Sequence, residues 1–236
     1  MRINKYIAEC GYASRRAADQ LIKDGKVKVN GKLIAELGMD VDETRDTVTV
    51  DGEKLEPVGR YIYIMLNKPK GCVCTVDDDK GRKTIMDYVD ITRERVFPVG
   101  RLDYDTEGLL LLTNDGALTH KLTHPSHEVG KSYVVKITSE VPENDLALMR
   151  NGMDIGEGDK TGRAKVKLLG IEDGIYRYEL TIYEGKNRQV RRMFEKVGKE
   201  VLFLKRVAVG ELRLGGLARG KCRFLTDKEV SYLRVM

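Results

Sequence analysis

The spacing of hydrophobic and polar positions divides the first 55 residues into two helices and a small sheet. Hydrophobic residues recur at helical spacing over 2–10 and over 14–24, and the second stretch begins at Ser14, a favourable N-cap. Basic and apolar side chains then alternate up to an Asn-Gly pair at 30–31, and an Asp-Gly pair at 51–52 follows a second alternating stretch. The pattern predicts a helical pair with two β-hairpins.

From residue 61 onward the pattern is mainly that of strands separated by short helices. The four leucines Leu109–Leu112 form a continuous apolar run bounded by glycine and an Asn-Asp-Gly turn, which favours a strand buried on both faces, although periodicity alone leaves a buried helical segment open. Further strands are expected at 61–66, 131–137, 176–183 and within 201–209, and helices at 84–89, 117–120, 142–151, 188–194 and 227–233. Residues 156–162 form a glycine-rich loop without the spacing of a phosphate-binding P-loop.

Residues 56–60, Glu-Pro-Val-Gly-Arg, have the composition of a linker and show no periodicity. We therefore predict two domains, one spanning residues 1–58 and the other residues 59–236.

The net charge of +5 is concentrated at the two ends of the chain. Residues 1–33 hold eight basic residues against three acids, and residues 185–236 hold fourteen against five, whereas residues 34–60 are acidic. Two separated basic zones suggest a polyanion contacted at two places, although a solvated surface explains any single run of charge. No apolar run approaches the roughly 20 residues of a membrane span, and the N-terminus lacks the apolar region of a signal peptide.

The four cysteines are scattered and lack the paired spacing of a zinc site. We expect reduced thiols and a cytoplasmic protein. His120, His124 and His127 lie on one short segment, but no acid or cysteine completes an obvious ligand set, so no metal is expected.

The densest group of candidate functional residues is a charged loop that leads into the four leucines. It contains Arg101, Asp103, Asp105 and Glu107. A buried strand would hold such a loop in place, and functional residues are often found on loops braced in this way. Spacing alone leaves a solvated turn about equally favoured, and it does not choose between Asp103 and Asp105.

Gly-Arg-Leu-Asp at 100–103, followed by Gly-Leu-Leu-Leu-Leu-Thr-Asn-Asp-Gly at 108–116, resembles the signature of RNA pseudouridine synthases, specifically their ribosomal-RNA branch, the Rsu/Rlu group. Leu-Asn-Lys-Pro-x-Gly at 66–71 is similar to the first motif of that family, and Lys-x-Tyr at 131–133 to the second. The basic segment 185–191 resembles the third motif. Lys68 and Lys70 receive no role beyond the solubility of a turn.

This resemblance implies roles for individual residues. Asp103 takes the position of the catalytic aspartate, and Tyr133 that of the tyrosine that stacks on the target base and is a candidate proton acceptor. Arg191 takes the position of the arginine that pairs with this aspartate, which would keep Asp103 ionised. Arg101 is expected to fill the space left by a flipped nucleotide or to hold that nucleotide. The remaining basic residues near the third motif are expected to bind RNA: Lys186, Arg188 and Arg192. Many relatives have arginine in place of Lys186, and a lysine lacks the bidentate fork.

Ala-Ser-Arg-Arg-Ala-Ala at 13–18, together with Gly-Lys-Val-Lys-Val-Asn-Gly at 25–31, resembles the S4 RNA-binding domain. In that family the basic helix and the hairpin bind the phosphates of RNA. The matching residues are Arg15, Arg16, Lys26 and Lys28. Contacts of this kind supply affinity without reading bases.

The resemblance implies an α+β protein, with a small S4-like α/β domain and a catalytic domain on a mixed, mainly antiparallel sheet. The implied reaction is isomerisation of a uridine in ribosomal RNA, with 23S favoured over 16S, without cofactor or metal. A monomer is expected that acts on ribosomal RNA or on subunit assembly intermediates. The alternatives are a ribosome assembly factor that binds RNA without catalysis, and a hydrolase that pairs Asp103 with Glu107 and releases free base.

Overall fold

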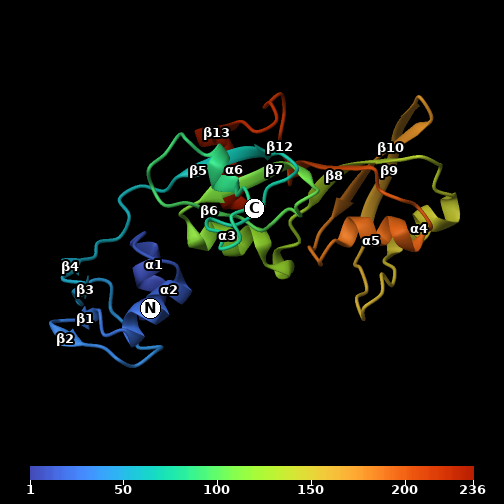
Figure 1. Ribbon diagram of the computed structural model, residues 1–236. Coiled ribbons are helices and arrows are strands. Elements are labelled where there is room, and N and C mark those ends of the chain that lie inside the picture. Colours follow the sequence, from blue (N-terminus) through green and yellow to red (C-terminus); the bar gives the residue numbers. More distant parts are fainter. The chain divides into compact units, whose positions relative to one another are not determined.

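The computed structural model describes residues 1–236, and the chain separates into two compact units (Figure 1). The first comprises residues 1–62 with the short segments 93–96 and 114–116, and the second comprises the rest of the chain. Every helix is too short or too polar to cross a membrane.

The N-terminal unit packs two helices against a four-stranded antiparallel sheet of order β2-β1-β3-β4. Ser14 caps the second helix, because its Oγ accepts a hydrogen bond from the Ala17 amide at 3.1 Å. Asn30 and Gly31 both adopt positive φ, as the tight turn between β1 and β2 requires. The predicted helices and hairpins are confirmed. The elements are α1 (Ile3–Glu9), α2 (Arg15–Lys23), β1 (Val27–Val29), β2 (Lys32–Leu33), β3 (Val48–Val50) and β4 (Glu53–Lys54).

The larger unit is built on a nine-stranded sheet whose main path runs β13-β5-β7-β11-β8-β10-β9 (Figure 1). Only β7 and β11 pair in parallel, so the sheet is mixed and mainly antiparallel, as predicted. Two short strands lie off the path, β6 beside β7 and β12 beside β11. The strands are β5 (Tyr63–Lys68), β6 (Phe97–Pro98), β7 (Glu107–Thr113), β8 (Lys131–Ile137), β9 (Ala164–Glu172), β10 (Ile175–Ile182), β11 (Phe203–Val209), β12 (Leu212–Arg213) and β13 (Cys222–Phe224).

The sequence predicted five of the six helices of this unit, all except the single turn η2. The helices are η1 (Ile85–Tyr88), α3 (Gly116–Thr123), η2 (Pro125–His127), α4 (Glu143–Asn151), α5 (Gln189–Lys196) and α6 (Asp227–Val235). Helix α5 lies along the β8–β10 part of the sheet, where the ring of Phe194 meets that of Tyr178 at a centroid distance of 6.2 Å (Figure 1). Strand β9 was not predicted. It is an edge strand with exposed Leu168, Leu169 and Ile171, so its side chains lack a clean alternation.

The four leucines lie in β7, and every residue of β7 and of its neighbour β5 is buried. This settles the alternatives for Leu109–Leu112 in favour of a strand. In the antiparallel register of the two strands, Leu109 lies opposite Asn67 and Gly108 opposite Lys68. The end of β5 therefore lies beside the charged loop that enters β7.

Candidate active site

A cavity of 320 Å³ opens in the larger unit where this loop meets β8, β11 and the segment before α5. Its volume lies at the lower end of the roughly 300–1,000 Å³ typical of small-ligand pockets. The cavity brings together three regions that resemble family motifs. They are the Gly-Arg-Leu-Asp loop at 100–103, the Lys-x-Tyr segment at 131–133 and the basic segment at 185–191. Its charged and phenolic lining residues are Arg101, Asp103, Lys131, Tyr133, Glu184, Lys186, Arg188 and Arg206.

Asp103 begins a β-turn, in which its carbonyl oxygen accepts a hydrogen bond from the Thr106 amide at 3.1 Å. The Asp103 carboxylate forms no ion pair within the chain, so it remains available to a molecule in the cavity.

The buried side chain of Lys68 holds this turn in place through its main-chain carbonyl groups. Its side chain is 0% exposed, and its Nζ donates to the main-chain carbonyl oxygens of Asp103 and Thr106, each at 3.0 Å, and of Pro69 at 3.1 Å. An ammonium group has three protons to donate, so all are used and its charge is solvated by carbonyl dipoles in place of water. This role of Lys68 was not predicted from the sequence. The only available signal was the place of Lys68 at the end of an apolar strand.

Gly108 allows β7 to approach β11 closely at the entry of the strand. Its φ is +110°, and a Cβ at this position would lie 2.1 Å from the main-chain oxygen of Arg206. The two strands could not keep this spacing with any other residue at 108. The close approach fixes the loop relative to Arg206, whose side chain lines the cavity.

The arginines of the third motif pair with Asp105. Arg188 donates to both carboxylate oxygens of Asp105 at 3.3 Å, and Arg191 Nη2 lies 3.1 Å from Oδ2 and 3.1 Å from the Asp105 carbonyl oxygen. Burial raises the pKa of Asp105, but the hydrogen bonds from Arg188 and the charges of Arg191 and Arg188 outweigh it and hold the pKa below its ordinary value.

The prediction that Arg191 pairs with Asp103 is therefore wrong. Arg191 is buried, donates its remaining Nη1 to the Val201 carbonyl oxygen at 3.1 Å, and does not line the cavity. Asp103 and Asp105 are only two residues apart, and spacing could not show which carboxylate the helix α5 would meet. In the structure, Arg191 anchors the loop by binding the carboxylate and the carbonyl oxygen of Asp105.

Tyr133 lies on β8 between β10 and β11, opposite Leu180 on one side and Arg206 on the other. Its side chain is 8% exposed and forms part of the cavity wall. A planar aromatic ring in the wall of a cavity can stack on a base that enters.

Arg206 and Lys131 place two cations in the same cavity, and the sequence analysis assigned neither a role. Arg206 is buried, and its Nε donates to the Leu109 carbonyl oxygen at 2.7 Å. Burial, and to a smaller extent the charge of Arg206, lowers the pKa of Lys131. Lys131 opens the second motif but no role was assigned to it, and Arg206 lies on β11 outside all the motifs, so spacing did not reveal that the two cations share one cavity.

The segment before α5 is tied to the glycine-rich loop at 156–162. Arg192 pairs with Asp159 at 2.7 Å and with Glu157 at 3.5 Å, and Lys186 lies 3.4 Å from Asp159. The side chain of Arg192 is only 12% exposed. Its binding of RNA stays a prediction, but the side chain already braces this loop. Lys186, Arg188 and Arg101 all line the cavity.

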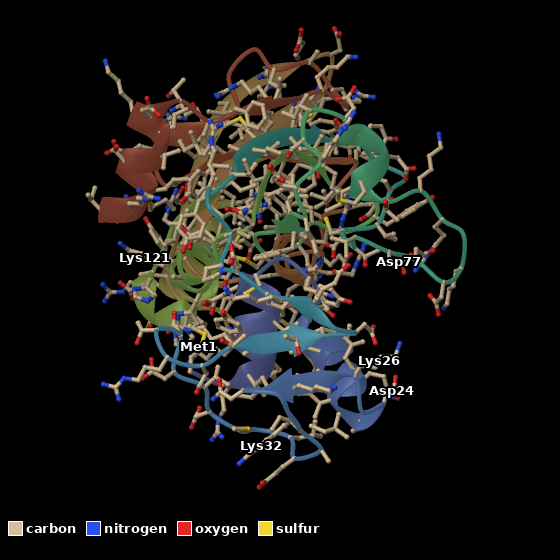
Figure 2. The ribbon with its side chains drawn as sticks, turned by 90° about the vertical axis from the view of Figure 1, so that its left-hand side faces the viewer. Met1, Asp24, Lys26, Lys32, Asp77 and Lys121 are labelled. Atoms are coloured by element: carbon tan, nitrogen blue, oxygen red, sulfur yellow. The ribbon has the colours of Figure 1, made fainter.

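The predicted phosphate contacts of the N-terminal unit are exposed. Arg15 and Arg16 occupy the first turn of α2, while Lys26 and Lys28 flank Val27 on the first hairpin strand. Figure 2 shows Lys26 at the surface of this unit, where its Nζ lies 3.6 Å from Asp51. Each of the four side chains is therefore accessible from solvent, on the helix or on the hairpin.

The three histidines lie close together, with the rings of His120 and His124 stacked at a centroid distance of 4.9 Å. No group of three or more histidine, cysteine, aspartate or glutamate side chains is arranged to hold a metal ion. The four cysteines are free thiols. The chemistry available in the cavity is that of two carboxylates, a phenol and several cations.

Two family models match the chain. The model described as RNA pseudouridylate synthase matches residues 62–196, which include Asp103, Tyr133 and Arg191. The S4 domain model matches residues 1–48.

The chain is similar over its whole length to named relatives. It is 48% identical to the ribosomal large subunit pseudouridine synthase B of Bacillus subtilis (strain 168), with 100% of this chain and 96% of the relative covered. It is 41% identical to an uncharacterized RNA pseudouridine synthase of Aquifex aeolicus (strain VF5), with 99% and 93% covered. A crystal structure of a pseudouridylate synthase superimposes with a TM-score of 0.72 at 36% identity, covering 99% of each chain. On this evidence, the chain belongs to the family of RNA pseudouridine synthases and carries an S4 domain at its N-terminus.

Proposed function

We propose that the protein converts a uridine of large-subunit ribosomal RNA into pseudouridine, with Asp103 as the catalytic residue. The supporting observation is that Asp103, whose carboxylate forms no ion pair within the chain, and Tyr133 line one cavity. The choice of large-subunit RNA over 16S RNA follows the name of the Bacillus subtilis relative.

The reaction breaks the N1–C1′ bond of the uridine, turns the uracil and joins C5 to C1′. The hydrogen on C5 leaves as a proton and N1 gains one, so the exchange needs no external oxidant or reductant. A uridine within a duplex cannot reach Asp103 while it is stacked, so the nucleotide has to flip out of the helix. We propose that Tyr133 stacks on the flipped uracil and that Arg101, exposed at the cavity rim, contacts the RNA beside it.

The cations would hold the RNA backbone. The same cavity as Asp103 is lined by Lys131, Lys186, Arg188 and Arg206, and their charge favours a phosphate near the flipped base. The basic helix and hairpin of the S4 domain would bind RNA elsewhere, and the two attachments together raise the local concentration of the catalytic domain on its substrate. We further propose a cytoplasmic monomer that acts on ribosomal RNA or on a subunit assembly intermediate, with a domain boundary near residue 58.

The test uses ribosomal RNA that carries tritium at uridine C5, because C5 loses its hydrogen when it becomes the glycosidic carbon. The wild type should release tritium from large-subunit RNA and not from small-subunit RNA. Asp103→Asn should reduce the rate by about 10³-fold or more. It should still bind RNA and fold normally, because the carboxylate has no partner within the chain.

Full activity of Asp103→Asn would remove Asp103 from the mechanism. Tight binding by the wild type without release from free RNA, naked subunits or assembly intermediates would favour an assembly factor. Release of free uracil would indicate a hydrolase.

A further inference from the structure

A second cavity, of 420 Å³, lies on the other side of the catalytic loop. Arg101, Leu102 and Asp103 line both cavities, so the loop forms the wall between them. The far side of the second cavity is formed by the segment 73–82, and Figure 2 shows Asp77 of this segment on a loop that projects from the larger unit. Nothing in the proposed reaction uses this second cavity.

Tyr104 stands at its edge, at a central position of the turn that Asp103 begins. The backbone around it is fixed: the Tyr104 carbonyl oxygen accepts from the Gly71 amide at 2.9 Å, and the flanking carbonyls of Asp103 and Asp105 accept from Lys68 and Arg191. The side chain, in contrast, is 54% exposed, and its hydroxyl makes no hydrogen bond within the chain.

An aromatic ring that is this exposed, on a backbone that is fixed, contributes little to the core. It is suited to contact a flat partner, and the partner at this site is RNA. When a nucleotide leaves the stack, its neighbours lose a stacking surface, and proteins that bind unstacked RNA commonly replace it with an aromatic side chain. The position of Tyr104, one residue from Asp103, places its ring next to whatever flanks the target.

We propose that Tyr104 stacks on the base of a nucleotide adjacent to the target uridine and that the second cavity receives this base. This inference rests on the proposed function. Tyr104 is then a positioning residue: it holds the RNA so that the target uridine reaches Asp103, and it takes no part in bond making.

The lining of the second cavity selects a base rather than a phosphate. Its charged lining residues are four aspartates and two arginines, so the lining carries a net negative charge. Asp77 and Asp79 are exposed, Arg82 pairs with Asp78 with Nη2 2.6 Å from Oδ1, and Arg101 is the remaining cation. Carboxylates repel a phosphate but accept hydrogen bonds from the amino groups of bases. Adenine, cytosine and guanine carry such a group and uracil does not. The structure therefore assigns the second cavity to an amino-bearing base.

The first experiment measures single-turnover tritium release from C5-tritiated large-subunit RNA. Tyr104→Phe keeps the stacking ring and should keep wild-type activity. Tyr104→Leu should lower the rate at subsaturating enzyme about 10- to 100-fold, the loss expected when one stacked base loses its aromatic partner. The rate at saturating enzyme should change much less, a split that a distorted active site would not produce. Phe224→Leu, which alters an equally exposed aromatic residue on β13, is the control and should behave as wild type.

The second experiment uses a synthetic RNA hairpin around the uridine mapped in the first, with single abasic sites at the flanking positions. One abasic site should weaken the wild type and leave Tyr104→Leu unaffected, because the variant has already lost that contact. Restoring uracil at this position should rescue the wild type less than restoring adenine, cytosine or guanine.

The outcomes separate the two claims. No tritium release by the wild type contradicts the proposed function itself. Release by the wild type with equal rates for Tyr104→Leu, or equal sensitivity of both proteins to every abasic site, overturns the stacking role and leaves the proposed function standing.

Discussion

Replacing Gly108 with alanine should separate the two strands that carry the catalytic loop and Arg206. The new Cβ would lie 2.1 Å from the Arg206 main-chain oxygen and 2.7 Å from its nitrogen. These are backbone atoms within a parallel strand pair, so no side-chain rotation relieves the contact. Because ordinary contact begins at about 3.4 Å, β11 would have to move by roughly 1 Å or the pair would have to open.

Three costs combine in this variant. A residue with a Cβ at φ +110° loses about 1–2 kcal/mol relative to glycine. Overpacking of a tight interior contributes about 1–3 kcal/mol, and each ladder hydrogen bond that is lost contributes about 0.5–1.5 kcal/mol. We expect a loss of about 3–5 kcal/mol, a large part of the 5–15 kcal/mol typical of a folded domain.

The measurement is urea unfolding followed by far-ultraviolet circular dichroism, since the chain contains no tryptophan. The matched control is Gly215→Ala. Gly215 also has positive φ, +60°, but a Cβ there meets nothing within 4 Å, so this variant shows the backbone cost alone, about 1 kcal/mol. If both variants lose the same stability, the close approach of β7 and β11 does not carry the cost, and the reasoning is refuted.

Two further variants test other features. Lys68→Met removes one charged hydrogen-bond donor from each of three main-chain carbonyl oxygens, so we expect a loss of about 3 kcal/mol in thermal unfolding and slower tritium release. The exposed Lys70→Met should change neither, and equal behaviour of the two variants would show that Lys68 does not hold the loop. Hydrogen bonds from Arg223 lower the pKa of Glu229 at the start of α6 to about 2 from 4.5. Because the folded pKa is depressed, the pair stabilises the protein above pH 4.5 and the contribution is lost as pH falls toward 2. Glu229→Gln should therefore cost about 1 kcal/mol at neutral pH and flatten the stability profile in that window, and an unchanged profile in urea unfolding would contradict this.

Most elements could be predicted because they depend on short-range patterns. The α2 helix has its cap at Ser14, the first hairpin has its turn at 30–31, and β7 is an uninterrupted apolar run. Strand β9 escaped prediction because it lies at the sheet edge with apolar side chains on its exposed face. An element could be predicted where the pattern of its sequence showed which of its side chains are buried, and could not where it did not.

The site was less accessible to prediction, since its contacts join residues distant in the chain. Motif resemblance singled out Asp103 and Tyr133, and in the structure both line one cavity. The partner of Arg191 could not be predicted, because Asp103 and Asp105 differ only in how the turn presents them to α5. Lys68 was assigned to a solvated turn, because a lysine is rarely buried, and only the register of β5 and β7 reveals the three carbonyls that solvate it.

Lys68 holds the catalytic loop through its backbone. The backbone position of the loop can therefore stay constant while the side chains on the loop vary. Lys68 binds carbonyl oxygens, which every amino acid possesses, and makes no demand on the side chains at the turn. The side chains at 101 and 104 can therefore change without moving the backbone of Asp103. Such a scaffold lets substrate choice drift, or be redesigned, while the geometry of the chemical step is retained. A library randomised at these two positions is thus a rational starting point for redirecting the enzyme to a different uridine.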